Sequence, residues 1–513
     1  MKRTTLSLIA AGAALAAITS VAAVAAPEEG PATAGRAAQQ PVERSSLLCP
    51  APSSSELAET TYTAYTPKTE VSAGSGTAAL VPAARALADK DGKGDKGEKD
   101  GEGKGEKDGK EAKPFLAVKK QGTPVTAEEN GSGAPALIGL AEGGLAPGWS
   151  AQQTTVFPAG AGRGLHGLGC SAPDTDFWFP GASTAEDRSD YLHLTNPDDS
   201  AAVVDIELHG KDGALDSEVG EGIQVPPGSS VPVLLSTLTG KPQTNLTVHV
   251  SARSGRVAAA VQALDAKLGG DWIAPSAEPS DSVVLPGIPK DATAVRLVAF
   301  APGSADADLK VSLAGPNGAL APAGHETLHL KSGMTTAVDL GELTRGEAGS
   351  LVLTPSGDSG KTPVVAAVRV LRGKGADQES AFIPAARPVG DRATVTGNAA
   401  KGTHLALTAP GKAAKVRVTA SAGAEGGTPA TKTYSVGAGR TLAAAIPVPD
   451  SLKGTYALTV ETVSGGPVHA SRTLTLSGDE ADGVPMFTVQ NLTDDRGTVT
   501  VPAARPEMRV LLD

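Results

Sequence analysis

The chain has 513 residues, among them 62 Gly and 38 Pro, and a formal net charge of −11. This length allows three or four domains. The Gly and Pro content disfavours long helices, because each such residue costs roughly 1–3 kcal/mol inside a helix. Three Trp, five Tyr and seven Phe are too few for one large aromatic core or for a groove lined by many rings. The acidic balance argues against a nucleic-acid-binding protein, which would carry a basic stripe.

The N-terminus has the pattern of a secretory signal peptide. Residues 1–3 carry two positive charges, residues 4–25 carry none, and a small-x-small cleavage site ends at Ala25, with Ala26 as the first mature residue. A retained membrane anchor is the alternative, since an uncharged stretch of this length could span a bilayer. The pattern predicts a secreted or extracytoplasmic protein associated with the cell envelope.

The two cysteines, Cys49 and Cys170, are expected to form a disulfide, because thiols of an exported chain are usually paired. Closing a loop of about 120 residues would stabilise the fold by roughly 4–5 kcal/mol. Two free buried thiols are the alternative. Two distant cysteines supply too few ligands for a metal site.

Two segments have compositions typical of disorder. Residues 26–44 are rich in Pro, Ala, Gly and Gln and are predicted to form a disordered linker. Residues 89–113 consist almost entirely of Lys, Asp, Glu and Gly and offer nothing to a core. This charged insert interrupts residues 45–189, which we interpret as a divergent N-terminal β domain. A calcium-loop frame starting at Asp89 lacks the Glu required at its last position, so no calcium site is predicted.

From about residue 190 the chain repeats itself. Similar phrases recur about every 105 residues and place Pro197, Pro302 and Pro410 in register. Most runs alternate apolar with polar residues, as in strands with one buried face. A unit of this size fits one immunoglobulin-like β-sandwich, although two propeller blades of about 50 residues would fit as well. We predict an all-β chain of tandem immunoglobulin-like β-sandwich domains, with a β-propeller as the alternative, and repeats at 190–290, 291–388 and 389–513.

Turn signals separate the predicted strands. Asp-Gly at 212–213 and Asn-Gly at 317–318 predict β-hairpins. Small residues at 254–255, 357–360 and 464–466 occupy corresponding places in the repeats and are also interpreted as hairpin turns.

Residues 357–360 spell Gly-Asp-Ser-Gly, the core of the trypsin-like nucleophile motif. That chemistry needs a His to take the proton of Ser359 and an Asp to orient the His. The Gly-Pro that follows this core in the protease family is absent, as is any Ala-Ala-His-Cys-like stretch. Ser359 is therefore predicted to be a turn residue.

Histidines and tryptophans are the other candidate site residues. His325 and His329 are four residues apart, but along the predicted strand this spacing is about 13 Å, too far for one metal ion. We expect His193, His209 and His249 to lie on the polar faces of strands. A three-histidine metal site is the alternative. Trp178 and Trp272 are expected to pack in a core. The alternative is that they form an exposed platform on which a sugar stacks.

The sequence contains no nucleophile elbow, phosphate loop, dinucleotide fingerprint or paired-cysteine metal motif. We therefore predict that the protein is not an enzyme and has no catalytic residue, metal or cofactor. Paired carboxylates of a hydrolase would not be visible as a sequence pattern. A deep pocket with perturbed acids would favour that alternative.

Four phrases, at 178–181, 192–197, 225–229 and 269–272, resemble those of an actinobacterial family of exported proteins of unknown function. The resemblance covers most of the chain from Ser45 onward. Its motifs are structural, so it implies no active site.

The combined prediction is an exported, non-enzymatic cell-envelope or secreted protein with a structural or scaffold role. The alternative is an extracellular binding module whose partner is an envelope protein or a glycan. No nucleic-acid partner is expected. Contact with a membrane is expected only if the N-terminal segment stays uncleaved.

Overall fold

The structure is a computed structural model that describes residues 38–69, 75–83, 114–217, 219–357, 361–375, 377–476 and 486–501. The predicted signal peptide with its cleavage site at Ala25 and Ala26, the charged insert 89–113 and Ser359 lie outside these residues. Within them the regular elements are strands and two short 3₁₀ turns, η1 (Gly131–Gly133) and η2 (Leu235–Thr237). No helix in this part of the chain is long and apolar enough to cross a membrane.

By its internal contacts the chain divides into two compact units, residues 41–498 and residues 1–40 together with 499–513. Strands β1 (Ala38–Pro41) and β38 (Thr498–Val501) pair as a two-stranded sheet. The prediction of a disordered linker over 26–44 is therefore wrong at its end, where backbone pairing with a distant strand orders residues whose composition gave no strand signal. All that follows concerns residues 41–498.

The first sandwich joins two four-stranded sheets. One has the order β2 (Arg44–Cys49), β7 (Leu137–Gly143), β4 (Gly76–Pro82), β5 (Leu116–Val118). The other has the order β6 (Val125–Asn130), β3 (Glu59–Tyr65), β8 (Ser150–Phe157), β9 (Gly164–Gly169). Tyr62, Leu80 and Trp149 fill the core between them. The predicted disulfide between Cys49 and Cys170 is confirmed, with a Cα–Cα distance of 4.6 Å, and it ties β2 to the residue after β9.

The second sandwich repeats this plan. Its first sheet contains β10 (Asp176–Ala182), β16 (Leu246–Ser254), β12 (Ala202–Gly210), β13 (Gly213–Leu215) and β14 (Ile223–Val225). Its second sheet has the order β15 (Ser230–Leu234), β11 (Arg188–Thr195), β17 (Ala258–Asp265), β18 (Gly269–Ile273). The alternating burial of β12 is what the period-two pattern predicts for a strand with one face in a core.

The third and fourth sandwiches have equivalent strand orders. The third contains β19 (Val283–Ile288), β25 (Gly349–Pro355), β21 (Ala307–Gly315), β22 (Gly318–Leu320) and β23 (Thr327–Leu330) against β24 (Thr335–Gly341), β20 (Ala294–Phe300), β26 (Val365–Arg372), β27 (Glu379–Pro384). The fourth contains β28 (Arg392–Asn398), β35 (Tyr456–Gly465), β30 (Ala414–Ala420), β32 (Ala430–Val436) against β33 (Arg440–Ala444), β29 (Thr403–Ala409), β36 (His469–Thr475), β37 (Phe487–Leu492), with β31 (Gly426–Thr428) and β34 (Asp450–Lys453) as a small extra pair.

These pairings confirm an all-β fold built of β-sandwiches, and the described residues form no propeller. They also move two predicted boundaries. Strand β10 pairs with β16, so the second sandwich begins ahead of the predicted residue 190. Strand β19 pairs with β25, so the third begins ahead of 291. In each case the first strand pairs with one about 70 residues later, a long-range contact that the local repeat does not contain.

The turn predictions divide into two groups. The hairpins at 212–213 and 317–318 are confirmed, because β12 pairs with β13 and β21 with β22 across two-residue turns. The interpretation of 254–255 and 464–466 as hairpins is wrong, since β16 and β17, like β35 and β36, lie in different sheets. Strands β25 and β26, on either side of 357–360, are separated in the same way. These links cross from one sheet of a sandwich to the other.

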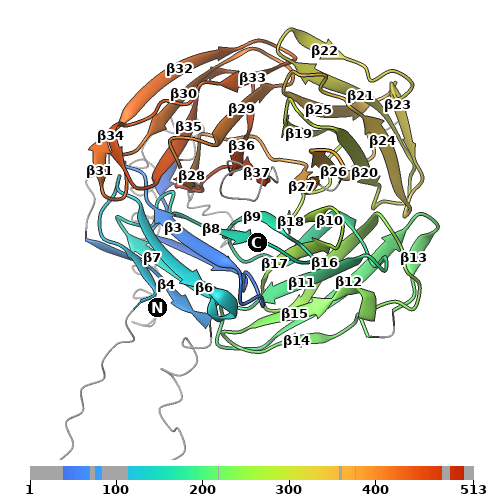
Figure 1. Cartoon of the computed structure of the whole chain (residues 1–513), viewed down its shortest axis with the longest axis horizontal. Coiled ribbons are helices and arrows are strands. Elements are labelled where there is room, and N and C mark those ends of the chain that lie inside the picture. Colours follow the sequence, from blue (N-terminus) through green and yellow to red (C-terminus); the bar gives the residue numbers. More distant parts are fainter. Residues whose placement is uncertain are drawn as a thin grey trace, which may run out of the picture. The chain divides into compact units, whose positions relative to one another are not determined.

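The last strand of each sandwich contacts its counterparts in a closed circuit (Figure 1). Strand β9 contacts β18 and β37, and β27 contacts both β18 and β37. Side chains interlock along this circuit. Phe382 of β27 packs into the core of the second sandwich, and Phe487 of β37 packs into the core of the third. Each ring also lies under a guanidinium of the receiving sandwich, at 5.5 Å from Arg188 and 4.8 Å from Arg372.

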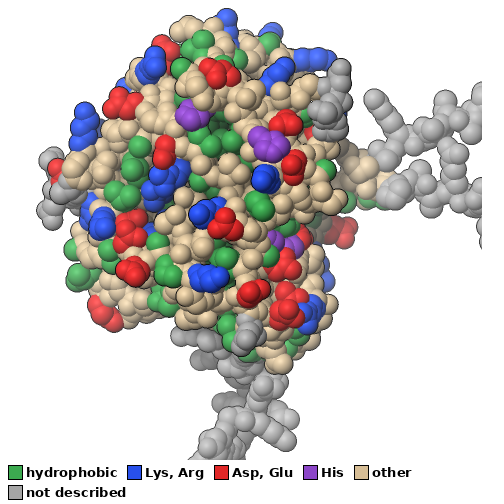
Figure 2. Space-filling model, turned by 90° about the vertical axis from the view of Figure 1, so that its right-hand side faces the viewer, with side chains coloured by type: hydrophobic (Ala, Val, Ile, Leu, Met, Phe, Trp, Pro, Cys, Tyr) green, Lys and Arg blue, Asp and Glu red, His purple; other side chains and the backbone are tan. Residues whose placement is uncertain are grey.

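One face of the molecule is mixed in charge. On the face shown in Figure 2, Lys and Arg side chains are interspersed with Asp and Glu, and hydrophobic side chains are scattered among them. This face carries no broad patch of one charge.

Candidate functional site

A cavity of about 330 Å³ lies where the four sandwiches meet, and we call it the junction cavity. Each sandwich contributes to its lining, for example through Trp149, His193, Phe382 and Gln490. Its volume is at the lower end of the range of about 300–1,000 Å³ usual for small-molecule sites. All three tryptophans of the chain line it, namely Trp149, Trp178 and Trp272.

Several buried polar atoms of this lining have no hydrogen-bond partner. They include Nε1 of Trp149 and of Trp272, Oγ1 of Thr396 and Nε2 of Gln490. All four side chains are more than nine-tenths buried. An unpaired buried polar group costs about 1–3 kcal/mol, so a cluster of four around one cavity is unusual for a structural core.

The amide oxygen of Gln490, in contrast, accepts two hydrogen bonds. Its Oε1 accepts a hydrogen bond from Nε2 of Gln152 at 3.1 Å and another from Nη2 of Arg472. Arg472 is completely buried and also donates to the carbonyl of Thr396 and to Oδ1 of Asn398, 3.0 Å away. These bonds fix the orientation of the Gln490 amide and leave its Nε2 group unpaired.

Most of the charged residues of the lining lie in its outer, exposed part. Arg387 pairs with Glu278 at 2.7 Å, and Asp495 pairs with Arg392 at 2.6 Å. The side chain of Asp495 is only 4% exposed, and burial raises its pKa. The other buried side chains of the lining carry no carboxylate, ammonium or guanidinium group. Burial lowers the pKa of His193 to about 4, so its imidazole is neutral at pH 7.

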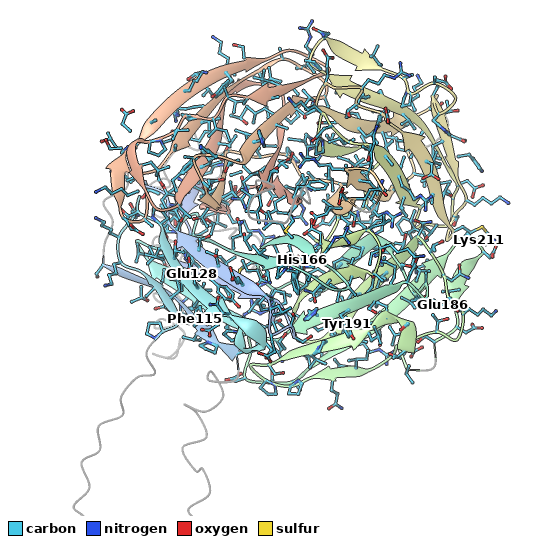
Figure 3. All side chains as sticks on the ribbon, viewed as in Figure 1. Phe115, Glu128, His166, Glu186, Tyr191 and Lys211 are labelled. Atoms are coloured by element: carbon cyan, nitrogen blue, oxygen red, sulfur yellow. A yellow bond between two sulfur atoms is a disulfide. The ribbon has the colours of Figure 1, made fainter. Side chains whose placement is uncertain are left out.

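A second polar cluster lies beside the cavity without lining it, and we call it the buried acid cluster. It consists of His166, Asp271 and Glu379, on β9, β18 and β27; Figure 3 marks His166. Nε2 of His166 donates to the carbonyl of Gly162 at 2.8 Å, and burial lowers the pKa of the ring to about 4.

Both carboxyl groups of this cluster are strongly perturbed. Oδ1 of Asp271 accepts hydrogen bonds from the amides of Trp272 and Gly167 and from the hydroxyl of Thr488, at 2.8–3.1 Å. Burial nevertheless raises the pKa of Asp271 well above its usual range, with a further contribution from the negative charge of Glu379.

Glu379 is in a similar position. Its Oε2 accepts a hydrogen bond from the amide of Phe487 at 3.1 Å, and burial raises its pKa to about 8 despite the nearby Arg163 and Arg372. The cluster thus holds two carboxyl groups that favour the protonated state, and its hydrogen bonds cross three of the contacts between sandwiches.

The three predicted histidine positions do not converge. His193 contacts the edge of Trp272, with ring centroids 5.2 Å apart. His249 instead stacks on Trp178 at 3.8 Å, with His209 on the same indole at 6.5 Å. No group of three or more His, Cys, Asp or Glu in the described residues could hold a metal ion.

The imidazole of His249 lies between two carboxylates. Its Nδ1 is 3.0 Å from Glu207 and its Nε2 is 2.8 Å from Asp176. Histidine on a polar face is the default position that the sequence predicts, whereas His193 differs from it by being buried.

Of the pair His325 and His329, only His329 lies on the predicted strand, since β23 (Thr327–Leu330) begins after His325. His329 lies on β23, exposed and 2.8 Å from Asp308. Trp178 and Trp272 are buried, which confirms core packing for both. Trp149, Thr396, Gln490 and Glu379 were not identified from the sequence. Glu379 and Gln490 lie on β27 and β37, the last strands of the third and fourth sandwiches, whereas Trp149 precedes β8 and Thr396 lies on β28. The recurrence of similar phrases about every 105 residues was the available signal for such equivalent strands.

The Family of unknown function (DUF5719) matches residues 125–447, more than half of the chain. The chain belongs to this family. The DUF5719 match runs from β6 into the fourth sandwich and includes β9, β18 and β27 of the circuit, while β37 lies beyond it. The predicted resemblance to a family of unknown function is confirmed, and the host lineage stays a prediction. A search of curated proteins finds no match.

Proposed function

We propose that this DUF5719 protein is an exported, non-enzymatic scaffold of the cell envelope. The observation that carries the proposal is the closed circuit formed by the last strands of the four sandwiches, in which Phe382 and Phe487 each pack into the core of the preceding sandwich. Independent domains joined by flexible linkers would not share hydrophobic cores in this way. Shared cores favour one stiff body, which suits a spacer or platform between envelope components.

The position of the perturbed acids supports a non-enzymatic role. A hydrolase needs its carboxyl groups in contact with the substrate. Asp271 and Glu379 do not line the junction cavity, and each accepts a hydrogen bond from a backbone amide of a neighbouring sandwich, which joins the two sandwiches. Asp495, whose pKa burial also raises, does line the cavity. Its carboxylate is held in an ion pair with Arg392 and by a hydrogen bond from the hydroxyl of Thr394.

Export is supported by the N-terminal sequence pattern together with the disulfide between Cys49 and Cys170. Disulfides persist in oxidising compartments outside the cytoplasm. Fractionation of the host should recover the mature chain in the envelope or medium. Recovery in the cytoplasm with reduced thiols would contradict the proposal.

The scaffold role is tested by loosening the circuit in the full chain. Phe382→Ala removes a ring from a core shared by two sandwiches. The matched control Phe179→Ala removes an equally buried ring that belongs to the second sandwich alone. Each is expected to cost about 3–5 kcal/mol.

Cross-linking in envelope extract provides the readout. The wild type and the control Phe179→Ala variant should capture the same envelope partner, and Phe382→Ala should lose it while remaining folded by circular dichroism. Equal capture by both variants, or no captured partner with the wild type, would overturn the scaffold role.

A further inference from the structure

We propose that the buried acid cluster is a pH-sensitive latch, which holds the circuit of last strands closed while its carboxyl groups are protonated and lets the circuit open as they ionise. The latch concerns a movement of the sandwiches relative to one another, so it goes beyond the scaffold role and does not depend on it. The inference rests on the hydrogen bonds that cross the cluster, on its burial and on the charges that face it.

The two carboxyl groups lie where the last strands meet. Strand β9 is at the edge of its sheet, and the amide of Gly167 on this strand donates to Oδ1 of Asp271 on β18 at 3.1 Å. Strand β37 is also an edge strand, and its Phe487 amide donates to Oε2 of Glu379 on β27 at 3.1 Å. An edge strand leaves backbone donors unpaired. Here carboxyl groups of the neighbouring sandwiches accept from such donors, so the acids themselves join the strands of the circuit.

The cluster is closed to solvent. Within the described residues, Nδ1 of His166, Oδ2 of Asp271 and Oε1 of Glu379 are buried and have no hydrogen-bond partner. Packing around them is close, because a Cβ added to Gly164 would lie 3.3 Å from Oε1 of Glu379, and one added to Gly270 would lie 2.9 Å from the His166 ring. A charge buried without compensation is costly. Ionisation of either acid therefore favours an arrangement in which its carboxylate reaches water.

Two arginines face Glu379, and both have other partners. Arg163, which precedes β9, donates from Nη2 to the carbonyl of Gln378 at 2.7 Å. Arg372 on β26 forms an ion pair with Asp291 at 2.5 Å. Both guanidinium groups lower the pKa of Glu379, but burial outweighs them and raises it to about 8. The nearby positive charge is thus insufficient to keep this carboxyl ionised at neutral pH.

The other facing groups add no positive charge at neutral pH. Burial lowers the pKa of His166 on β9 to about 4, so its ring is neutral. Strand β37 faces the cluster with Phe487 and Thr488, neither of which has an ionisable side chain. The charge of Glu379 contributes to the raised pKa of Asp271. Ionisation of both acids therefore places like charges at the contact between β18 and β27.

Proton linkage gives the direction and the steepness of opening. The pKa of Glu379 is about 8 in the closed circuit against an ordinary 4.5, and that of Asp271 is raised well above its ordinary 3.8. Opening between these values releases protons, so it is favoured as the pH rises. His166 opposes this only below its ordinary value of 6.5, where the opened chain takes up a proton. From about pH 6.5 to 7.5 the opening constant should rise about a hundredfold per pH unit, about tenfold from each carboxyl.

Hydrogen exchange of the full mature protein measures this opening at the amides of Gly167 and Phe487, which donate to the two carboxyl groups. After division by the intrinsic rate at each pH, exchange at both amides should increase about a hundredfold per pH unit in this range. Strand β30 lies inside the fourth sandwich and is paired on both sides. Its amides should show no such increase, because opening leaves the core of each sandwich intact.

Two variants assign the effect to the latch. Glu379→Gln and Asp271→Asn each remove one ionisable group and keep an oxygen that accepts the same hydrogen bond. Each should reduce the increase to about tenfold per pH unit, and the double variant should abolish it. Glu342→Gln, at an exposed position outside the cluster, is the control and should behave as the wild type.

Three results would overturn the latch. The first is exchange at Gly167 and Phe487 that follows only the intrinsic rate. The second is the same pH dependence in the wild type, Glu379→Gln and Asp271→Asn. The third is an equal increase at β30, which would mean that the whole chain unfolds instead of the circuit opening. None of these results depends on capture of an envelope partner, so failure of the latch and failure of the scaffold role are distinguishable.

Discussion

Replacing Glu379 by Gln should make the protein more stable at alkaline pH and leave it nearly unchanged at acidic pH. Glu379 is almost completely buried, and its Oε2 accepts a hydrogen bond from the amide of Phe487 on the neighbouring sandwich. A Gln side chain has the shape of the protonated acid and can accept the same bond. It removes the ionisable group without removing the contact.

The sign follows from the raised pKa of Glu379, which is about 8 in the folded state against an ordinary value of 4.5. Below about pH 4.5 the carboxyl is protonated in both the folded and the unfolded chain. Between pH 4.5 and 8 the folded chain keeps a proton that the unfolded chain has released, so stability falls as the pH rises. Since one pKa unit corresponds to about 1.4 kcal/mol, the loss by pH 8 is on the order of 4–5 kcal/mol.

The assay is urea unfolding followed by tryptophan fluorescence at pH values from 4.5 to 8.5. Glu379→Gln should match the wild type near pH 4.5 and exceed it progressively toward pH 8.5. Glu342→Gln, at an exposed position, is the control and should follow the wild type throughout. Parallel pH profiles for the wild type and Glu379→Gln, or a less stable variant at pH 8, would refute the burial argument.

Three further predictions concern other parts of the chain. Reduction of the bond between Cys49 and Cys170 should lower stability by about 4–5 kcal/mol, given the 121-residue separation, and thiol labelling of the denatured, unreduced chain should find no free thiol; two labelled thiols would contradict it. Deleting residues 89–113 should shift the thermal midpoint by less than about 5 °C, because loop-closure entropy changes slowly with length; a larger fall would mean that the insert packs or binds an ion. Ser359→Ala should change stability by no more than about 0.5 kcal/mol, and labelling of Ser359 by a fluorophosphonate probe would show an activated serine instead.

The local pattern of the sequence was sufficient for many of the strands, although not for β1. Alternating apolar residues placed β12 and β23 correctly, since a period of two is inherent in a strand with one buried face. The Asp-Gly and Asn-Gly turns gave two hairpins because their backbone preferences act over four residues. The disulfide followed from having only two cysteines in a chain whose N-terminus has the pattern of a signal peptide.

The partners of each strand were decided only in the folded chain. The sequence shows that β16 and β17 each bury a face, but it does not show that they lie in different sheets of one sandwich. The same limit explains why β10 was assigned to the wrong unit. The apolar face of a strand shows that the strand packs against another element. It does not show which strand that element is.

The site depends even more on tertiary structure. Thr488 reaches Asp271 across 217 positions of sequence, and Gln152 reaches Gln490 across 338. Burial of Asp271 and Glu379 comes from neighbouring sandwiches, so neither raised pKa is implied by the strand that carries the residue. The sequence by itself determined many of the strands and the disulfide, because these depend on neighbouring residues and composition. Closure of the circuit alone determined the junction cavity, since its walls come from four sandwiches that are separate in sequence.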